Sequence, residues 1–332
     1  MFDSVCHYDL SNHFINGHHF YIINTNFTVG VAISFPQVDF QYIKLNRETG
    51  TNFTQTIPVN SNIQSMLQVY NNGDILFYTN SDTGNLPLYH PGNNTITNPQ
   101  SILYTDAQSS YAHVPYSGTG YNANTNTVYS FVVVNQTFDI GVLAISFNDQ
   151  SFEYTSLTNR PINVTAWSSC YDPNNQTFYA SLLLSDAVMQ TAVYDTFNKA
   201  EVMLFNVSLD IDVDNDWFGE PFLNVYVWDS LMYVMVGADQ PGYPLWIGVV
   251  DLETQHVKTI MQDNLMLLTD SIPTFSVDPV HGYMSAYGLD VDSETAYLYM
   301  LDMSTQAYTK IAQPKLYVGP QDFMYEAFWT SS

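Results

Sequence analysis

The clearest candidate for chemistry in this sequence is a run of carboxylates at alternate positions, followed by one further glutamate. Its members are Asp210, Asp212, Asp214, Asp216 and Glu220. Alternating carboxylates supply the hard oxygen ligands that calcium prefers in a short loop. Asn215 stands where the helix-flanked calcium loop has its turn glycine, and no glutamate occupies the twelfth position. The run therefore predicts calcium as a cofactor, with a solvated acidic connection as the alternative.

Other groups that could do chemistry lack a catalytic pattern. They are the acidic cluster Asp290, Asp292 and Glu294 and the early histidines His7, His13, His18 and His19. No carboxylates are spaced so as to complete a metal site with these histidines, which are typical of a polar hairpin turn. The sequence contains no Gly-x-Ser-x-Gly elbow, phosphate-binding loop or His-Glu-x-x-His motif. The lack of such motifs favours a non-catalytic protein over an enzyme, which stays open as the alternative.

Aromatic residues are abundant, with 25 Tyr, 20 Phe and 5 Trp in 332 residues. Most of them belong in a core. Four members near the later turns are expected on an exposed rim, where they would stack on sugar rings or pack against a partner. They are Trp217, Phe218, Tyr243 and Trp246.

The charge balance excludes two classes of partner. Only 7 Lys and Arg face 32 Asp and Glu, which gives a formal net charge of -25. Such a surface repels a nucleic-acid backbone and an anionic membrane alike. The longest apolar runs, such as residues 131–134 and 246–250, are far shorter than the roughly 18 to 20 residues of a membrane helix. Neither nucleic-acid binding nor membrane insertion is expected.

The location is predicted from weaker signals. Asn-x-Ser/Thr sequons, the acceptors of N-linked glycans, occur at Asn26, Asn52, Asn93, Asn135, Asn163, Asn175 and Asn206. With few lysines and many Tyr, Asn and Thr, the composition favours an extracellular or cell-surface glycoprotein. Residues 1–4 do not resemble a signal peptide, because they have neither a basic start nor an apolar segment.

The two cysteines, Cys6 and Cys170, are too few for a disulfide framework. In the repeat described below they occupy equivalent places in units three apart. That separation is far beyond the roughly 7 Å between Cα atoms that a disulfide allows. Two separate buried thiols are expected.

The organisation of the chain becomes clear in the stretch from Asn163 to Phe205. Aromatic and β-branched runs, such as 164–171 and 178–184, are bounded there by turn residues, as at Asp172 and Pro173. This pattern is typical of antiparallel strands joined by hairpins. It predicts four short strands, whereas no window has the apolar period of a helix.

Similar turn signals recur about every 50 residues, from Asp9 through Asn71, Asn122, Asp172 and Asp229 to Asp278. The unit resembles one blade of a β-propeller. Sheets that are apolar on both faces bury them by packing around a common axis. Two stacked sandwiches, the alternative, favour one-sided alternation of apolar and polar residues. We predict a single all-β domain over residues 1–332, most simply with six four-stranded blades, and with seven as the alternative.

The predicted blades cover approximately residues 4–45, 66–102, 112–156, 163–205, 222–261 and 274–311. A further strand follows at 322–329, with the apolar residues Phe323, Met324, Tyr325, Phe328 and Trp329. It either completes the first blade and closes the ring, or it is surplus. A surplus strand has an unpaired edge that is able to join another chain.

Three functions are compatible with these features. The first is a non-catalytic extracellular scaffold or adhesive subunit that self-associates through the surplus strand, into a filament or a surface coat. The second is a propeller that binds carbohydrate or other extracellular proteins through an acidic rim loaded with calcium. The third is a calcium-dependent six-bladed hydrolase or lactonase. The lack of a catalytic motif and the surplus strand favour the first.

Overall fold

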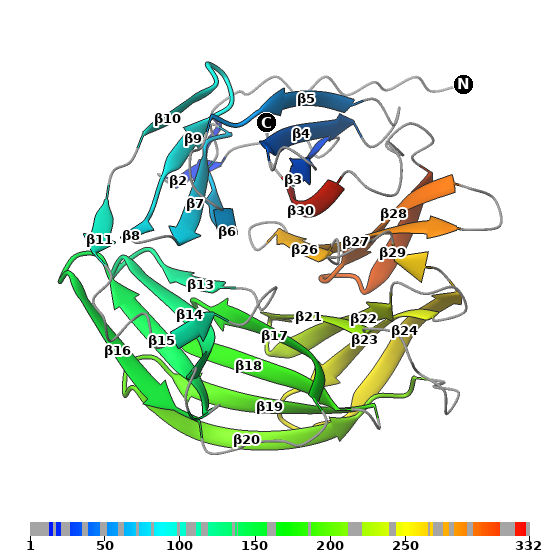
Figure 1. Ribbon diagram of the computed structural model, residues 1–332. Helices are drawn as coiled ribbons and strands as arrows, with labels where there is room; N and C mark the ends of the chain where they lie inside the picture. Colours follow the sequence, from blue (N-terminus) through cyan, green and yellow to red (C-terminus); the bar gives the residue numbers. More distant parts are fainter. Residues whose placement is uncertain are drawn as a thin grey trace, which may run out of the picture.

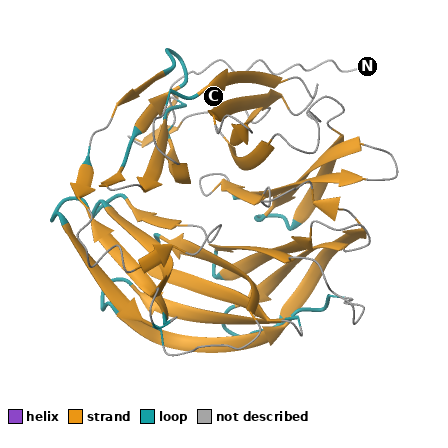
Figure 2. Cartoon of the chain, in the orientation of Figure 1, coloured by secondary structure: helices purple, strands orange, loops and turns teal. Residues whose placement is uncertain are grey.

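The computed structural model describes most of the chain, in segments separated by gaps. The described residues are 13–15, 18–20, 27–34, 39–46, 52–58, 63–70, 73–80, 83–97, 100–103, 111–113, 119–134, 137, 139–157, 164–184, 187–211, 221–238, 244–264, 266–267, 275–278, 282–290, 295–312 and 323–329. All regular elements within them are β-strands, without any helix in these segments (Figure 2). The all-β prediction is confirmed for this part of the chain.

Two consecutive four-stranded sheets have the simplest form of the repeating unit. Their strands are β17 (Val164–Asp172), β18 (Thr177–Leu184), β19 (Val188–Asp195) and β20 (Ala200–Ser208), followed by β21 (Pro221–Trp228), β22 (Leu231–Ala238), β23 (Pro244–Asp251) and β24 (Val257–Asn264). Each strand pairs antiparallel with the next one along the chain. The two sheets cover residues 164–208 and 221–264, close to the ranges predicted for these two blades, 163–205 and 222–261.

Three other sheets keep this order with small additions. They comprise β6 (Ile63–Val69), β7 (Ile75–Asn80), β8 (Thr83–Asn85), β9 (Leu88–His90), β10 (Thr95–Thr97) and β11 (Ser101–Leu103); then β12 (Tyr111–His113), β13 (Thr119–Asn122), β14 (Thr127–Val134), β15 (Ile140–Ser146) and β16 (Ser151–Ser156); and β25 (Met266–Leu267), β26 (Phe275–Asp278), β27 (Tyr283–Asp290), β28 (Thr295–Asp302) and β29 (Ala307–Ala312). Pro87 lies between β8 and β9. Because proline has no N–H to donate, it divides the third strand of that sheet in two.

The N-terminal sheet joins the two ends of the chain. Its order is β30 (Phe323–Trp329), β3 (Phe27–Ser34), β4 (Asp39–Asn46) and β5 (Asn52–Thr56). A separate hairpin is formed by β1 (His13–Ile15) and β2 (His18–Phe20). The predicted range of the first blade, 4–45, was therefore wrong, because its first strand is β30 and residues 27–34 and 39–46 are its second and third strands. Its fourth strand, at 52–56, lies beyond the expected 4–45.

The C-terminal strand is not surplus. All the residues proposed for assembly, Phe323, Met324, Tyr325, Phe328 and Trp329, lie in β30. This strand pairs antiparallel with β3 from Phe323 opposite Ser34 to Trp329 opposite Thr28. The strand that was expected to recruit another chain is thus paired within its own sheet, as in the ring-closing alternative.

One strand of each larger sheet lies nearest the centre and contacts its counterparts in the two neighbouring sheets. The order of these contacts is β6, β13, β17, β21, β26, β30 and back to β6. The sheets fan outward from this centre (Figure 1). The fold is a β-propeller with four-stranded antiparallel blades. Gly120 allows β13 to approach β17 closely, because a Cβ atom there would lie 2.3 Å from Cβ of Tyr171.

The hydrophobic core lies between blades rather than inside one. One cluster joins Leu183 of β18 to Val234 of β22 and Trp246 of β23. Another joins Tyr78 of β7 to Val128 of β14. Each sheet in these clusters buries apolar side chains against its neighbours, which explains the double-sided apolar runs in the sequence.

Candidate functional site

The predicted calcium ligands fall mainly outside the described residues. Asp210 is exposed just beyond β20, whereas residues 212–220, with Asp212, Asp214, Asp216 and Glu220, are not described. Asp290 ends β27, whereas Asp292 and Glu294 lie outside the described residues. The described segments contain no group of three or more His, Cys, Asp or Glu placed to hold a metal. The calcium site remains a prediction.

The described sequon asparagines lie at varied places in the blades. Asn93 is exposed in the β9–β10 turn, Asn175 in the β17–β18 turn and Asn206 on β20, and Asn52 begins β5. The Asn175 amide donates to Asp172 Oδ2 at 2.7 Å. Asn26, Asn135 and Asn163 lie outside the described residues. Glycosylation also remains a prediction.

Two expected features have clear positions. Cys170 is a buried free thiol, and burial raises its pKa far above the usual value, so it is not a reactive group; Cys6 is outside the described residues. Trp246, expected on an exposed rim, is fully buried. Its indole N–H donates to Thr259 Oγ1 at 3.1 Å, and Gly248 beside it leaves room for the ring.

Most turns at one end of the blades share a polar construction. Asp195 Oδ1 accepts the backbone N–H groups of Phe197 and Asn198 at 2.8 and 3.0 Å. Asp251 Oδ1 accepts the backbone N–H groups of Glu253 and Thr254 in the same way, both at 2.9 Å. The turns end in a residue of positive φ, such as Lys199 at 55°. These are Asx turns, in which a strand-ending aspartate replaces a backbone acceptor.

The β9–β10 turn departs from this construction. His90 ends β9 at the position that Asp195, Asp251 and Asp302 occupy in later blades. Asn94, four residues further, has the same positive φ of 54°. An imidazole does not form an Asx turn, so the turn does not account for a histidine at this position.

His90 instead joins a carboxylate and a hydroxyl. Its Nδ1 lies 2.8 Å from Asp74 Oδ2, and the two side chains are 26% and 16% exposed. Its Nε2 lies 3.2 Å from Oγ1 of Thr97, which is exposed. A carboxylate only accepts, so Nδ1 donates to Asp74, and Nε2 accepts from the Thr97 hydroxyl in the tautomer that carries its proton on Nδ1. This is the order of carboxylate, imidazole and hydroxyl by which a hydroxyl becomes a nucleophile.

A set of partly buried hydrogen bonds holds this hairpin in place. The hydroxyl of Tyr89, next to His90, donates to Asn94 Oδ1 at 3.0 Å. The Gln55 amide, from β5 of the neighbouring blade, donates to Tyr89 Oη at 2.6 Å and to the Pro91 carbonyl at 2.9 Å. Burial raises the pKa of Tyr89 to about 12, so it stays a neutral donor. These contacts fix the backbone from which His90 extends.

Tyr70 completes the surroundings on the side of the β6–β7 turn. Burial, followed by the charge of Asp74, raises the pKa of this phenol above its usual value. The pKa of Tyr121 on β13 is also raised, first by burial and then by the nearby Tyr70. Both phenols are therefore neutral at physiological pH.

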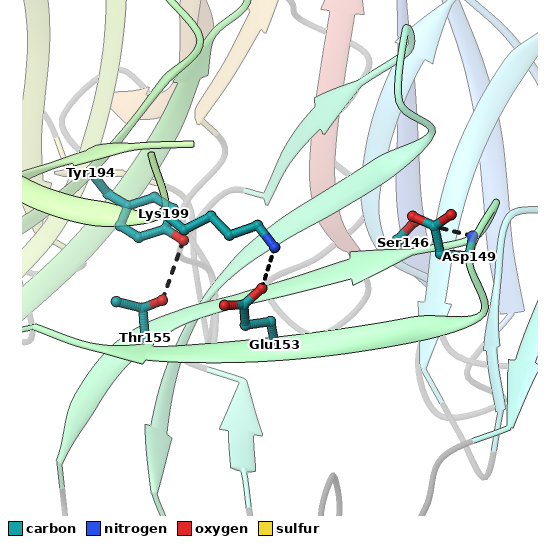
Figure 3. A network of polar contacts seen from close by, with 6 residues as sticks. All are labelled: Ser146, Asp149, Glu153, Thr155, Tyr194 and Lys199. Carbon is teal, nitrogen blue, oxygen red and sulfur yellow. Dashed lines mark hydrogen bonds and ion pairs between the residues drawn. The ribbon is translucent and has the colours of Figure 1, made fainter. Parts of the chain in front are cut away.

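Lysines serve a different purpose at the seams between blades. Lys199 Nζ lies 2.5 Å from Glu153 Oε2 on β16, and the hydroxyls of Tyr194 and Thr155 are 3.3 Å apart beside it (Figure 3). The hydrogen bond and charge of Glu153 raise the pKa of Lys199. Nearby, Ser146 Oγ donates to Asp149 Oδ2 at 2.8 Å within the β15–β16 turn. This network ties two outer strands together rather than forming a reactive centre.

A small cavity of about 10 Å³ lies between the same two blades. Its lining includes Phe131 and Ile140 from one blade, and Leu182, Ala192 and Leu204 from the other. A volume of this size holds about one water molecule, and an apolar lining offers a water few partners. The cavity is therefore a packing defect and not a ligand site.

The comparisons with known proteins identify a fold. No protein-family model and no curated protein matches the sequence. The solved structure of TolB from Acinetobacter baumannii is similar with a TM-score of 0.54 and 9% identity, over 92% of this chain and 66% of that one. The chain thus spans about two thirds of TolB.

Two putative 6-phosphogluconolactonases match along nearly their whole length. The one from Bacteroides uniformis has a TM-score of 0.54 and 11% identity, over 90% of this chain and 99% of that chain. The one from Bacteroides fragilis has a TM-score of 0.51 and 11% identity, over 90% and 98%. At such identities the likeness is one of fold.

The prediction of a self-associating adhesive scaffold was wrong. It depended on a surplus strand, which the pairing of β30 with β3 removes. Among the solved structures that resemble this chain in fold are TolB and two putative 6-phosphogluconolactonases. The described residues also include no helix long and apolar enough to cross a membrane.

Sequence analysis did not single out Asp74, His90 or Thr97. The three are brought together because the first and third turns of a blade emerge at the same end, and no short motif records that contact. One signal was present in the sequence. The aspartates that end the third strand, as at Asp195 and Asp251, are replaced in the second blade by a histidine.

Proposed function

We propose that this protein is a hydrolase of esters or lactones in which Thr97 is the nucleophile and His90 the base. The observation that carries the proposal is the chain of contacts from Asp74 through His90 to Thr97, at 2.8 and 3.2 Å. The partial exposure of His90 and the exposure of Thr97 leave both accessible to a substrate.

The reaction has two balanced steps. Thr97 Oγ1 attacks the acyl carbon while its proton moves to His90 Nε2, and the departing alcohol takes that proton. In a lactone, this alcohol remains attached to the acyl group. A water molecule then attacks the acyl-threonine ester, again giving a proton to His90, which returns it to Thr97. Asp74 keeps Nδ1 protonated and stabilises the imidazolium.

The likeness to lactonase-like propellers supports a hydrolase on this fold, although it concerns the fold alone. We also propose that six blades form a closed ring, which is supported by the cyclic contacts of β6, β13, β17, β21, β26 and β30.

Calcium binding by the carboxylates of 210–220 is retained as a separate proposal. Export to an extracellular or periplasmic space is supported by the low content of lysine and arginine.

An acyl-enzyme experiment tests the proposal. Incubation of the full chain with p-nitrophenyl acetate is expected to release p-nitrophenol and to leave an acetyl group on Thr97, detected by mass spectrometry of peptides. His90→Ala should slow the release by about 100-fold or more, the usual contribution of a positioned base. Thr97→Ser should retain the acetyl group on residue 97.

Matched variants separate catalysis from folding. Thr97→Val preserves the shape of the side chain and removes the hydroxyl, so it should abolish acetylation without altering the circular dichroism spectrum. His256, an exposed histidine of the β23–β24 turn, provides the control variant His256→Ala, which should have normal activity. Equal activity of the wild type, His90→Ala and Thr97→Val would overturn the proposed function.

A further inference from the structure

We infer that Gln55 is a positioning residue of the site proposed above, and that it acts from the neighbouring blade on the two residues that flank His90. This inference rests on the proposed function and adds to it a side chain that touches neither the substrate nor the reacting atoms. It comes from the hydrogen bonds that connect β5, the outer strand of the first blade, to the β9–β10 hairpin.

Gln55 directs both hydrogens of its side-chain amide at this hairpin. Its Nε2 lies 2.9 Å from the carbonyl oxygen of Pro91 and 2.6 Å from the hydroxyl oxygen of Tyr89. Because a carbonyl only accepts, the contact with Pro91 fixes which end of the amide faces the hairpin. The residue before His90 and the residue after it are therefore both bonded to one side chain of another blade.

Tyr89 extends this support to the other arm of the hairpin. Its hydroxyl accepts from Gln55 and donates to Asn94 Oδ1 at 3.0 Å, and its ring is fully buried. Asn94, which has a positive φ of 54°, is the last residue before β10, the strand that carries Thr97. The contacts that begin at Gln55 thus reach both strands of the site, the one with His90 and the one with Thr97.

The hairpin needs support from outside because its own side chain is used in the site. In the fourth blade, Asp195 restrains its turn by accepting two backbone N–H groups. His90 stands at that position in the second blade, and its ring contacts Asp74 and Thr97 instead. Gln55 supplies a restraint that the turn does not obtain from His90.

The reaction depends on one distance that this restraint controls. His90 Nε2 lies 3.2 Å from Thr97 Oγ1, at the upper end of the range of about 2.6–3.2 Å over which a base takes a proton. A misplacement of about 1 Å can slow a reaction roughly 100-fold. Loss of the Gln55 amide should therefore slow the attack by Thr97, although it removes no group that takes part in the chemistry.

Gln55→Met tests this inference, because it keeps the length of the side chain and removes both donors. The rate of p-nitrophenol release from p-nitrophenyl acetate is measured on the full chain, with spontaneous hydrolysis subtracted and the circular dichroism spectrum recorded. We expect kcat to fall at least about tenfold, with a wild-type spectrum. In the His90→Ala background, the same substitution should change the rate less than about twofold, because the base that it positions is absent.

Two further variants complete the experiment. Gln150 Nε2 donates to the Phe147 carbonyl at 2.9 Å in the β15–β16 turn, the equivalent turn of the next blade, so Gln150→Met is the matched control and should retain the wild-type rate within about twofold. Asn94→Gly cuts the contact with Tyr89, and glycine adopts the positive φ without strain. This variant should be several-fold slower than the wild type.

The outcomes distinguish the two proposals. The inference is overturned, while the hydrolase stands, if Gln55→Met is as fast as Gln150→Met. It is also overturned if Gln55→Met costs the same factor with and without His90, as a general loss of folded protein would. Should Gln55→Met not fold, a wild-type rate for Asn94→Gly overturns it. Absence of acetylation at Thr97 in the wild type overturns the proposed function itself.

Discussion

Tyr233 provides a sharp test of how neighbouring blades are held together. Its ring is 1% exposed on β22, and its hydroxyl donates to the carbonyl of Met303, a residue 1% exposed in the β28–β29 turn of the next blade. Gln306 in the same turn also bonds to this hydroxyl and accepts from Lys258. The phenol therefore connects two blades through a buried polar contact.

Tyr233→Phe removes the hydroxyl and keeps the volume of the ring. The main cost is the loss of a donor to a buried carbonyl, which is about 1–3 kcal/mol in the free energy of unfolding. With a urea m-value of about 3 kcal/mol/M, the unfolding midpoint should fall by roughly 0.3–1 M. Equilibrium unfolding in urea, followed by tryptophan fluorescence, measures this shift.

The control is Tyr308→Phe, because Tyr308 is 48% exposed on β29. This variant should stay within about 0.5 kcal/mol of the wild type, as surface substitutions usually do. If Tyr233→Phe is as stable as Tyr308→Phe, the contact between the two blades contributes nothing and the reasoning is refuted.

Two further predictions concern the polar turns. Asp172, which is buried, accepts hydrogen bonds from the Asn174 N–H and the Asn175 amide at 2.9 and 2.7 Å. In the same urea assay, Asp172→Ala should lower the free energy of unfolding by about 1–3 kcal/mol. Asp172→Asn, which places an asparagine as at Asn122 in the preceding blade, should restore most of that stability. The backbone N–H and side-chain amide of Asn198 lower the pKa of Asp195 below 3.8, its ordinary value. The Asp195 carboxylate therefore stabilises the fold above that pH, and this stabilisation is lost as the pH falls through the lower folded pKa. The stability difference between the wild type and Asp195→Asn should be constant from about pH 7 to pH 5 and shrink below about pH 4, and a difference independent of pH would contradict this.

The local part of the fold could be predicted from the sequence. Strand-ending acids such as Asp195 and Asp302 mark hairpin turns, because an Asx turn needs that side chain at that place. Runs that are apolar on both faces, as in β18, require a neighbour on each side. Both signals depend on residues close in sequence, and together they indicate a propeller.

The parts that were missed depend on distant residues. The first blade takes its innermost strand from 323–329, so the units of the N-terminal region are displaced by one strand from a simple count. Trp246 was expected at the surface, yet it occupies the core because Gly248, two residues later on the same face of β23, gives the indole its space. Spacing alone does not contain either fact.

The same limit applies to the candidate site, and it indicates where to look in repeat folds. Within such a fold, a position repeated in each blade has a structural requirement that its commonest residue reveals. Asp195, Asp251 and Asp302 satisfy that requirement by accepting backbone N–H groups. His90 at the equivalent position gives up this role and binds Asp74 and Thr97 instead. Gln55 and the buried Tyr89 hold the hairpin through partly buried hydrogen bonds, so His90 extends from a fixed backbone.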